Sequence, residues 1–322
     1  LLPQLREVHR IKLWNMDRVR DGALVMLYGY VLKMIIADRA ALLVDTVFHP
    51  NYYSQYVGFT AVIGAVLFSI QIYCDFAGYT YIAIGASKVM GIELMNNFNT
   101  PYLATSIKDF WDRWHISLTS WFRDYLYFTL GGSRKGKLRK YVNILVVFSV
   151  SGLWHGASWH YVLWGVLHGI LRVVEELTTK LRRKITAFLQ INTQTLSYKA
   201  FQIVVTFVVV TCLWVFFRAE SIGQAVDIIK NMVTVWNPWV LFDNSLLQIG
   251  LAGKDWNVLL VGLLLLLITE CFRYKRISLV QLFAEQNLLF QWIFFMVGIL
   301  SIVVFGIYGP AYDAAQFIYF QF

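Results

Sequence analysis

Long uncharged runs dominate the hydrophobic pattern of this chain. Three of them, residues 57–74, 200–217 and 288–308, contain 18, 18 and 21 residues without a charge. A helix of about 20 residues crosses a hydrocarbon core of about 30 Å. The shorter run at 256–269 can also cross where its ends extend or the bilayer thins. The pattern therefore predicts an all-α, polytopic membrane protein.

Between these runs the pattern is irregular. Residues 75–133 mix aromatic residues, glycines and charges, which favours short interfacial and re-entrant helices over clean crossings. Such backbone survives at membrane depth only when it is buried in protein or lines a wet cavity, so this region predicts a cavity. Residues 22–48 are apolar but carry charges such as Lys33, Asp38 and Arg39, which must face protein or an interface. Residues 1–20 are basic and amphipathic, as in a helix on a membrane surface.

Basic residues gather at the ends of the apolar runs and predict a topology. The segments RKGKLRK at 134–140, KLRRK at 180–184 and RYKR at 273–276 are expected to be cytoplasmic loops. Residues 218–255 hold few basic residues, which suits the outer side, and the C-terminus then lies outside. The stretch 141–154 rises only about 21 Å as a helix, so its junction with 157–174 should lie inside the membrane.

Composition excludes several other classes of protein. Hydrophobic residues make up 58% of the 322 residues and charged residues 15%, too few charges for a soluble domain of this size. The net charge of +9 resides in the predicted loops, which argues against a nucleic-acid-binding face. The three cysteines form no CxxC pair, so neither a disulfide framework nor a thiolate metal site is expected.

The first group of chemically capable residues is FWDRWHISLTSWFRD at 110–124. On a continuous helix, Trp111 and His115 would share a face, and Asp109 would reach Arg113. His115 then sits in an aromatic, partly buried setting. From these residues alone, it is either a functional histidine or a packed residue of an aromatic belt.

The second group is SGLWHGASWHYVLWGVLH at 151–168, which holds His155, His160 and His168. No HExxH or HxxxH pattern occurs here and no carboxylate lies between the histidines, so no metal site is predicted. Gly152 and Gly156 permit close approach either of a ligand or of another helix. A histidine near membrane mid-depth is a functional candidate, and an ordinary pKa near 6.5 suits His155 to general base catalysis.

Five segments are distinctive when they are taken together: QIYCDFAGY at 71–79, NFNTPY at 97–102, FWDRWHISLTSWFRDYLYFTLGG at 110–132, SGLWHGASW at 151–159 and FIYFQF at 317–322. Together they resemble the membrane-bound O-acyltransferases of the bacterial alginate O-acetylation type. The sibling branch that moves D-alanine onto teichoic acids shares DFAGY and RWH. The glycine-rich LGGSRKG at 130–136 fits the alginate-type branch better.

This resemblance implies a fold and a site. The fold is a ring of transmembrane and re-entrant helices around a central tunnel, here one membrane domain over residues 1–322. His155 matches the catalytic histidine of the family and His115 its second functional histidine. Asp112 stands where related sequences often carry a basic or neutral residue, which affects local ion pairing rather than the histidines. Because the chain starts in a polar stretch without Met, N-terminal helices are expected to precede it.

The resemblance also implies the reaction and its setting. An acyl group, expected to be acetyl, moves from a cytosolic donor, expected to be acetyl-CoA, toward hydroxyls of an extracytoplasmic polysaccharide such as alginate. We expect no bound cofactor and no metal. The expected partners are membrane lipid, the polysaccharide and an extracytoplasmic acyl-acceptor protein, and the setting is the bacterial inner membrane, crossed several times.

Three alternatives remain open on the sequence. One is D-alanyl transfer to teichoic acid. Another is a transporter or a scaffold of a polymer-export complex, which intramembrane charges such as Lys33 and Asp75 would suit, although no inverted repeat is visible. Within the acyltransferase hypothesis, a covalent route through Ser151 or Ser158 competes with direct base catalysis, but neither serine has an evident acid partner.

Overall fold

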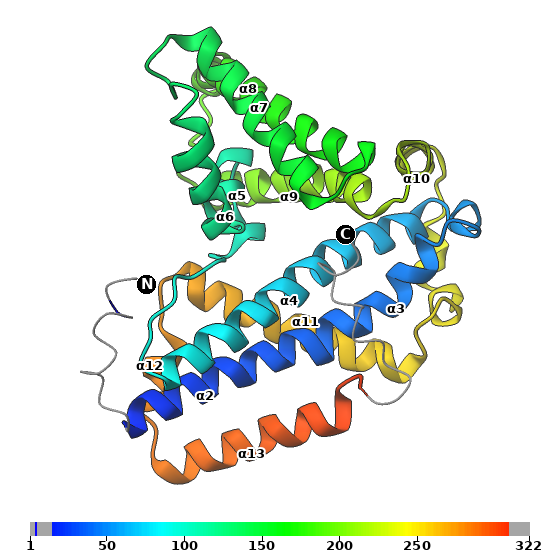
Figure 1. Cartoon of the computed structure of the whole chain (residues 1–322). Coiled ribbons are helices and arrows are strands. Elements are labelled where there is room, and N and C mark those ends of the chain that lie inside the picture. The colour runs from blue at the N-terminus through cyan, green and yellow to red at the C-terminus, as the bar shows by residue number, and fades with distance from the viewer. Residues whose placement is uncertain (1–3, 5–14, 309–322) are drawn as a thin grey trace. The chain divides into compact units, whose positions relative to one another are not determined.

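The computed structural model describes residue 4 and residues 15–308, and all regular secondary structure in that part of the chain is helical. The described helices, labelled in Figure 1, fall into two compact units. Within residues 15–308, the first unit takes residues 15–47, 67–97 and 239–308, and the second takes residues 48–66 and 98–238. The long helix α4 contributes residues to both units. A single membrane domain over the whole chain stays a prediction.

The first unit is built from long helices and a π-helix. Its elements are α2 (Met16–Tyr30), η2 (Val31–Ala37), α3 (Asp38–Val47), the later part of α4 (Phe59–Val89), η6 (Pro238–Leu241, at the boundary), η7 (Ser245–Gln248), α11 (Gly253–Tyr274), α12 (Leu279–Ala284) and α13 (Leu288–Phe305).

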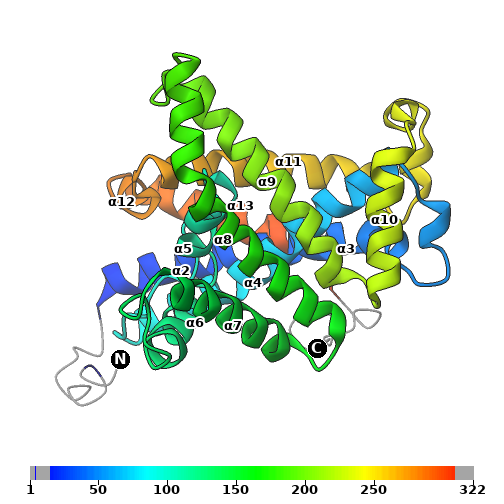
Figure 2. The same ribbon diagram turned by 90° about the horizontal axis from the view of Figure 1, so that it is seen from above.

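The second unit combines short helices with a long hairpin. Its elements are η3 (Tyr53–Gln55), the first part of α4, η4 (Pro101–Leu103), α5 (Ile107–Arg113), α6 (Ile116–Phe122), η5 (Arg123–Tyr127), α7 (Lys137–His155), α8 (Trp159–Phe188), α9 (Leu196–Arg218) and α10 (Ile222–Thr234). Figures 1 and 2 both show α7 lying beside the first half of α8.

Four of the described helices are long and apolar enough to cross a membrane by length and composition: α4, α9, α11 and α13. They contain the apolar runs at 57–74, 200–217, 256–269 and 288–308, with only the outermost residues of the first and last runs outside a helix. The prediction of an all-α, polytopic membrane protein is confirmed. The ring around a central tunnel stays a prediction.

The prediction of irregular backbone over 75–133 is wrong at its start, because α4 continues as one helix to Val89. The features that suggested a break serve packing instead. A Cβ atom on Gly78 or Gly85 would lie 2.9 or 2.5 Å from a backbone carbonyl oxygen of α2, so glycine lets the two helices meet closely. Beyond Val89 the prediction holds, with short helices through residue 127.

Two further expectations need correction. Residues 180–184 lie inside α8 and residues 137–140 inside α7, so these basic runs are largely helical rather than loops. Lys, Leu and Arg are good helix formers, and charge alone does not end a helix. The surface helix expected over residues 1–20 lies largely outside the described residues, and residues 16–20 open α2.

Side-chain caps fix where several of these helices begin. Asn15, Ser106, Thr195, Ser221 and Asn287 each accept a hydrogen bond from the backbone N–H three residues later. Such a cap satisfies one of the four N–H groups that a helix start leaves without a partner. In the second unit, the Ser106 cap sets the start of the short helix that leads to His115.

Candidate functional site

The backbone places His115 between two short helices rather than on one. Helix α5 ends at Arg113, and His115 adopts a left-handed conformation with φ of 43° before α6 begins. The expectation that Trp111 and His115 share one helical face is therefore wrong. The ion pair expected inside α5 is present, with Arg113 Nε 2.6 Å from Asp109 Oδ1. Asp112, the departure from the family pattern, pairs with Lys108 on the same helix.

His155 is the last residue of α7. Gly156, in extended backbone, ends the helix, and α8 starts at Trp159. The break expected at His155–Gly156 is confirmed. His155 and His160 therefore do not lie on one continuous helix.

Close helix packing explains the glycines of this segment. A Cβ atom on Gly152 would collide with the carbonyl oxygen of Tyr161, and one on Gly165 would collide with that of Phe148. The backbones of α7 and α8 thus approach each other directly at these two positions. Of the two interpretations left open for Gly152, the structure supports helix packing rather than ligand approach.

The two histidines meet around Trp154. The ring centroid of His115 lies 6.3 Å from that of Trp154, and the centroid of His155 lies 4.9 Å from it. Both imidazoles therefore lie in one small region, inside the limit of about 15 Å that a shared acyl group and acceptor would require. Their expected proximity is confirmed, while their catalytic roles stay a prediction.

Aromatic rings surround His155. Its imidazole meets Trp164 of α8 nearly edge-to-face at 5.3 Å, and Phe217 of α9 in the same manner at 5.2 Å. Only 7% of His155 and 9% of His115 remain exposed, whereas 53% of Trp154 is exposed. The buried imidazoles thus lie just behind a surface tryptophan, at the end of α7.

Both histidines lie outside the four candidate spanning helices, and burial shifts both toward the neutral form. Burial lowers the pKa of His115 to about 4. Burial, and secondarily the charge of His115, lowers the pKa of His155 to about 3. The expectation of an ordinary value near 6.5 is therefore wrong for His155. Each imidazole is neutral at neutral pH and can accept a proton without first losing one.

The sequence pattern did not predict the structural role of His168. This residue is fully buried, and the indole N–H of Trp111 donates to its Nδ1 atom over 3.2 Å. The bond ties α8 to α5, the helix that precedes His115. The signal available in the sequence was the spacing of Trp164 and His168, four residues apart and so on one face of α8.

His160 has a structural partner. Its Nδ1 atom lies 3.2 Å from the backbone carbonyl of Phe216, which identifies Nδ1–H as the donor and links α8 to α9. Among the described residues, no three His, Cys, Asp or Glu side chains are grouped to hold a metal ion. The absence of a metal or bound cofactor stays a prediction.

Comparison with known proteins gives a consistent picture. The family model of the membrane-bound O-acyltransferases, MBOAT, matches residues 14–219, which include both histidines. A Pseudomonas putida protein named "Probable alginate O-acetylase AlgI" is 32% identical over 318 residues, covering 96% of this chain and 62% of that protein. A Helicobacter pylori protein named "Peptidoglycan O-acetyltransferase" is 35% identical over 233 residues, covering 72% and 42%.

A more distant relative represents the teichoic acid branch. The Bacillus subtilis protein named "Teichoic acid D-alanyltransferase" is 31% identical over 188 residues, covering 54% of this chain and 46% of that protein. The chain spans less than two thirds of the length of each of these three relatives.

Proposed function

This chain belongs to the membrane-bound O-acyltransferase family, and on that premise we propose that it transfers an acyl group, most simply acetyl, to hydroxyls of an extracytoplasmic polysaccharide. One observation carries the proposal: His115 and His155, from segments 40 residues apart, both lie beside the exposed Trp154. Relatives named for alginate and peptidoglycan acetylation support a polysaccharide acceptor, with alginate as the first to test.

In the proposed reaction, His155 is the general base. Its neutral imidazole takes the proton of an acceptor hydroxyl as the oxygen attacks the acyl carbonyl. The bond from the carbonyl carbon to the leaving group then breaks, and the leaving group receives the proton from His155. General base catalysis of this kind contributes roughly 10²–10⁴-fold to a rate.

His115 is proposed to orient the acceptor or to stabilise the oxyanion that develops on the carbonyl. Its left-handed backbone aims the side chain from a turn rather than from a helix, and its Nδ1 atom lies 3.4 Å from Ser117 Oγ. A neutral imidazole carries one N–H, so the tautomer determines which nitrogen can donate to the oxyanion.

Acetyl-CoA is the proposed donor. Arg134, Lys135 and Lys137 lie in or next to the loop before α7 and are exposed, so they could attract its phosphates from the cytosol. The proposed setting is the bacterial inner membrane, with the basic residues of 134–140 and 180–184 on the cytoplasmic side. An extracytoplasmic acyl-acceptor protein is the proposed partner.

Reconstitution tests this proposal. The full chain is placed in proteoliposomes and given acetyl-CoA labelled in its acetyl group, with alginate as the acceptor. We expect ester-linked label on the polysaccharide from the wild-type chain and none above background from His155→Ala. A transporter or scaffold would neither transfer nor hydrolyse the donor. Equal transfer by both chains would overturn the role of His155.

A further inference from the structure

The two halves of α8 are built differently. All of its buried residues lie between His160 and Gly169, where it packs as the second helix of the α7–α8 hairpin. From residue 170 to residue 188 no residue of α8 is buried. Figure 2 shows α8 running as one helix from its junction with α7 to its junction with α9.

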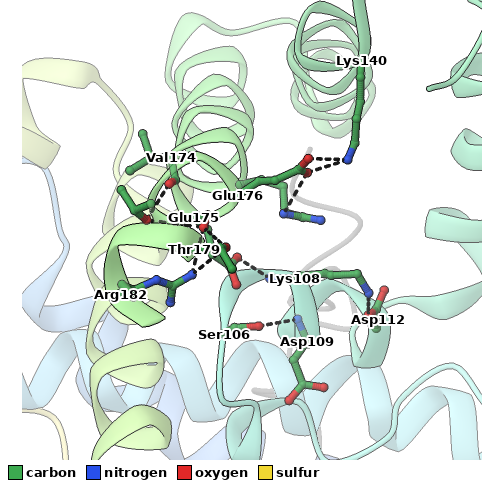
Figure 3. A network of polar contacts seen from close by, with 12 residues as sticks. Ser106, Lys108, Asp109, Asp112, Lys140, Val174, Glu175, Glu176, Thr179 and Arg182 are labelled. Carbon is green, nitrogen blue, oxygen red and sulfur yellow. Dashed lines mark hydrogen bonds and ion pairs between the residues drawn. The ribbon is translucent and has the colours of Figure 1, made fainter. Parts of the chain in front are cut away.

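The second half of α8 turns its acidic side chains inward. Glu175 accepts a hydrogen bond from the backbone N–H of Lys108 at the start of α5, over 2.9 Å. Glu176 pairs with Lys140 of α7, at 2.5 Å between Nζ and Oε1. Figure 3 shows both carboxylates pointing from α8 toward these partners. Polar contacts therefore fix one face of this helix to the rest of the unit.

The opposite face is apolar and exposed. Its residues are Ile170, Val174, Leu177, Leu181, Ile185 and Phe188, which are between 43% and 85% exposed. Their spacing of three or four residues places them in a stripe about 80° wide, because each residue of a helix turns about 100°. This pattern is the reverse of a soluble helix, which turns its apolar face inward.

Basic residues flank the stripe. Lys180 and Lys184 fall on one side of it and Arg182 on the other, and all three are exposed. Between Leu177 and Lys199 the sequence has no Asp or Glu. An apolar stripe between rows of cations is typical of a helix that lies in a membrane interface and contacts anionic headgroups.

We propose that residues 170–188 of α8 form an interfacial arm that binds an anionic phospholipid surface through this stripe and its flanking cations. Self-association is disfavoured, because two copies meeting through the same stripe would bring their uncompensated cations together. This inference does not depend on acyl transfer.

A fluorescent label tests the proposal. A polarity-sensitive dye is attached to a single cysteine at Leu181→Cys, with the native cysteines replaced by alanine and the full chain in proteoliposomes. Ala187→Cys is the matched control, since residue 187 is exposed on the same helix but off the stripe. We expect brominated phosphatidylcholine to quench the dye at 181 severalfold more than the dye at 187.

Charge provides the second arm of the test. Phosphatidylglycerol in the vesicles should shift the dye at 181 toward the bilayer. Lys180→Gln and Lys184→Gln should each weaken the binding of the labelled helix to the phosphatidylglycerol surface by roughly fivefold. Equal quenching of both positions by aqueous iodide, whatever the lipid, would overturn the proposal. So would crosslinking of 181 to a second copy or to another protein. Hydrogen exchange of unlabelled wild-type residues 170–188, slower with phosphatidylglycerol, keeps the test valid if the labelled variants misfold.

Discussion

The interiors of the two units are built from different chemistry. In the first unit, Lys33 is 95% buried, and its Nζ atom lies 2.7 Å from both Asp38 and Asp75. In the second unit, the buried polar groups around His155 are imidazoles and indoles among aromatic rings. Ions hold one interior together, and neutral dipoles line the other.

The ionic interior fixes helices to one another. Lys33 belongs to the π-helix η2, and Asp75 to α4. Arg39 donates to Asp255 of α11 at 3.2 Å and to the carbonyl of Phe305, at the end of α13, at 2.8 Å. Buried ions are costly unless paired, so these contacts specify which helices pack together. The transporter hypothesis rested on Lys33 and Asp75. Their pairing with each other gives these charges a structural role instead.

The aromatic interior serves a different purpose. A fixed charge beside His155 would change which protonation state burial favours, because an opposite charge stabilises imidazolium. Burial among aromatic rings instead favours the neutral form of the His155 imidazole. Substitutions in the interior of the first unit should therefore reduce stability, whereas substitutions at the site in the second unit should reduce activity.

The largest expected effect comes from His155→Ala. We expect a loss of polymer acylation of roughly 10²–10⁴-fold with membrane insertion intact, because the proposed base is removed. His160→Ala, which removes a hydrogen bond to a carbonyl of α9, should be milder. The measurement is ester-linked acyl content of the surface polymer in cells that express each variant at matched levels. Equal losses in both variants would point to packing instead.

Lys33→Met should have the next largest effect, on stability rather than on chemistry. It leaves two buried carboxylates without their ammonium partner, which costs about 3–5 kcal/mol in the free energy of unfolding. Thermal unfolding of the purified protein in detergent measures the change. Adding Asp75→Asn to Lys33→Met should recover part of the loss, since it removes one of the unbalanced charges. A double variant no more stable than Lys33→Met would show that charge balance is not the cause.

A smaller effect is expected from the bond between Trp111 and His168. Trp111→Phe keeps a ring but removes the donor, leaving the Nδ1 acceptor of His168 buried without its partner, at a cost of about 1–3 kcal/mol. A double-mutant cycle with His168→Phe isolates the bond, because each change should matter less in the presence of the other. Strictly additive losses of unfolding free energy would contradict a coupled pair.

The last prediction concerns how stability depends on pH. The native pKa values of His115 and His155, about 4 and about 3, lie below the unfolded value near 6.5. The unfolded chain therefore binds more protons, and stability falls as pH drops from about 6.5 toward 4. Unfolding midpoints at a series of pH values measure this, and His115→Phe should flatten the dependence. A midpoint that is unchanged in wild type across this window would contradict buried, neutral imidazoles.

From the sequence alone came the membrane class, the four candidate spanning runs and the choice of His115 and His155 as candidate site residues. Runs such as 200–217 and 288–308 need no partner to be recognised, because length and apolarity alone suit them to a bilayer. The junction at His155–Gly156 was also predicted, because the apolar stretch before it is too short to cross a bilayer as a helix. Whether the charged segments are helices or loops could not be predicted, because charge indicates neither a loop nor a helix break.

The roles of the buried polar groups follow from three-dimensional packing rather than from local sequence. Lys33 and Asp75 are 42 residues apart, and Trp111 and His168 are 57 apart. No local sequence pattern therefore predicts that either pair is in contact. The same holds for α4, whose charge at Asp75 and glycine at Gly78 suggested a break until partners on η2 and α2 accounted for both. The role of a buried polar group depends on the atoms beside it, and folding brings those atoms from distant parts of the chain.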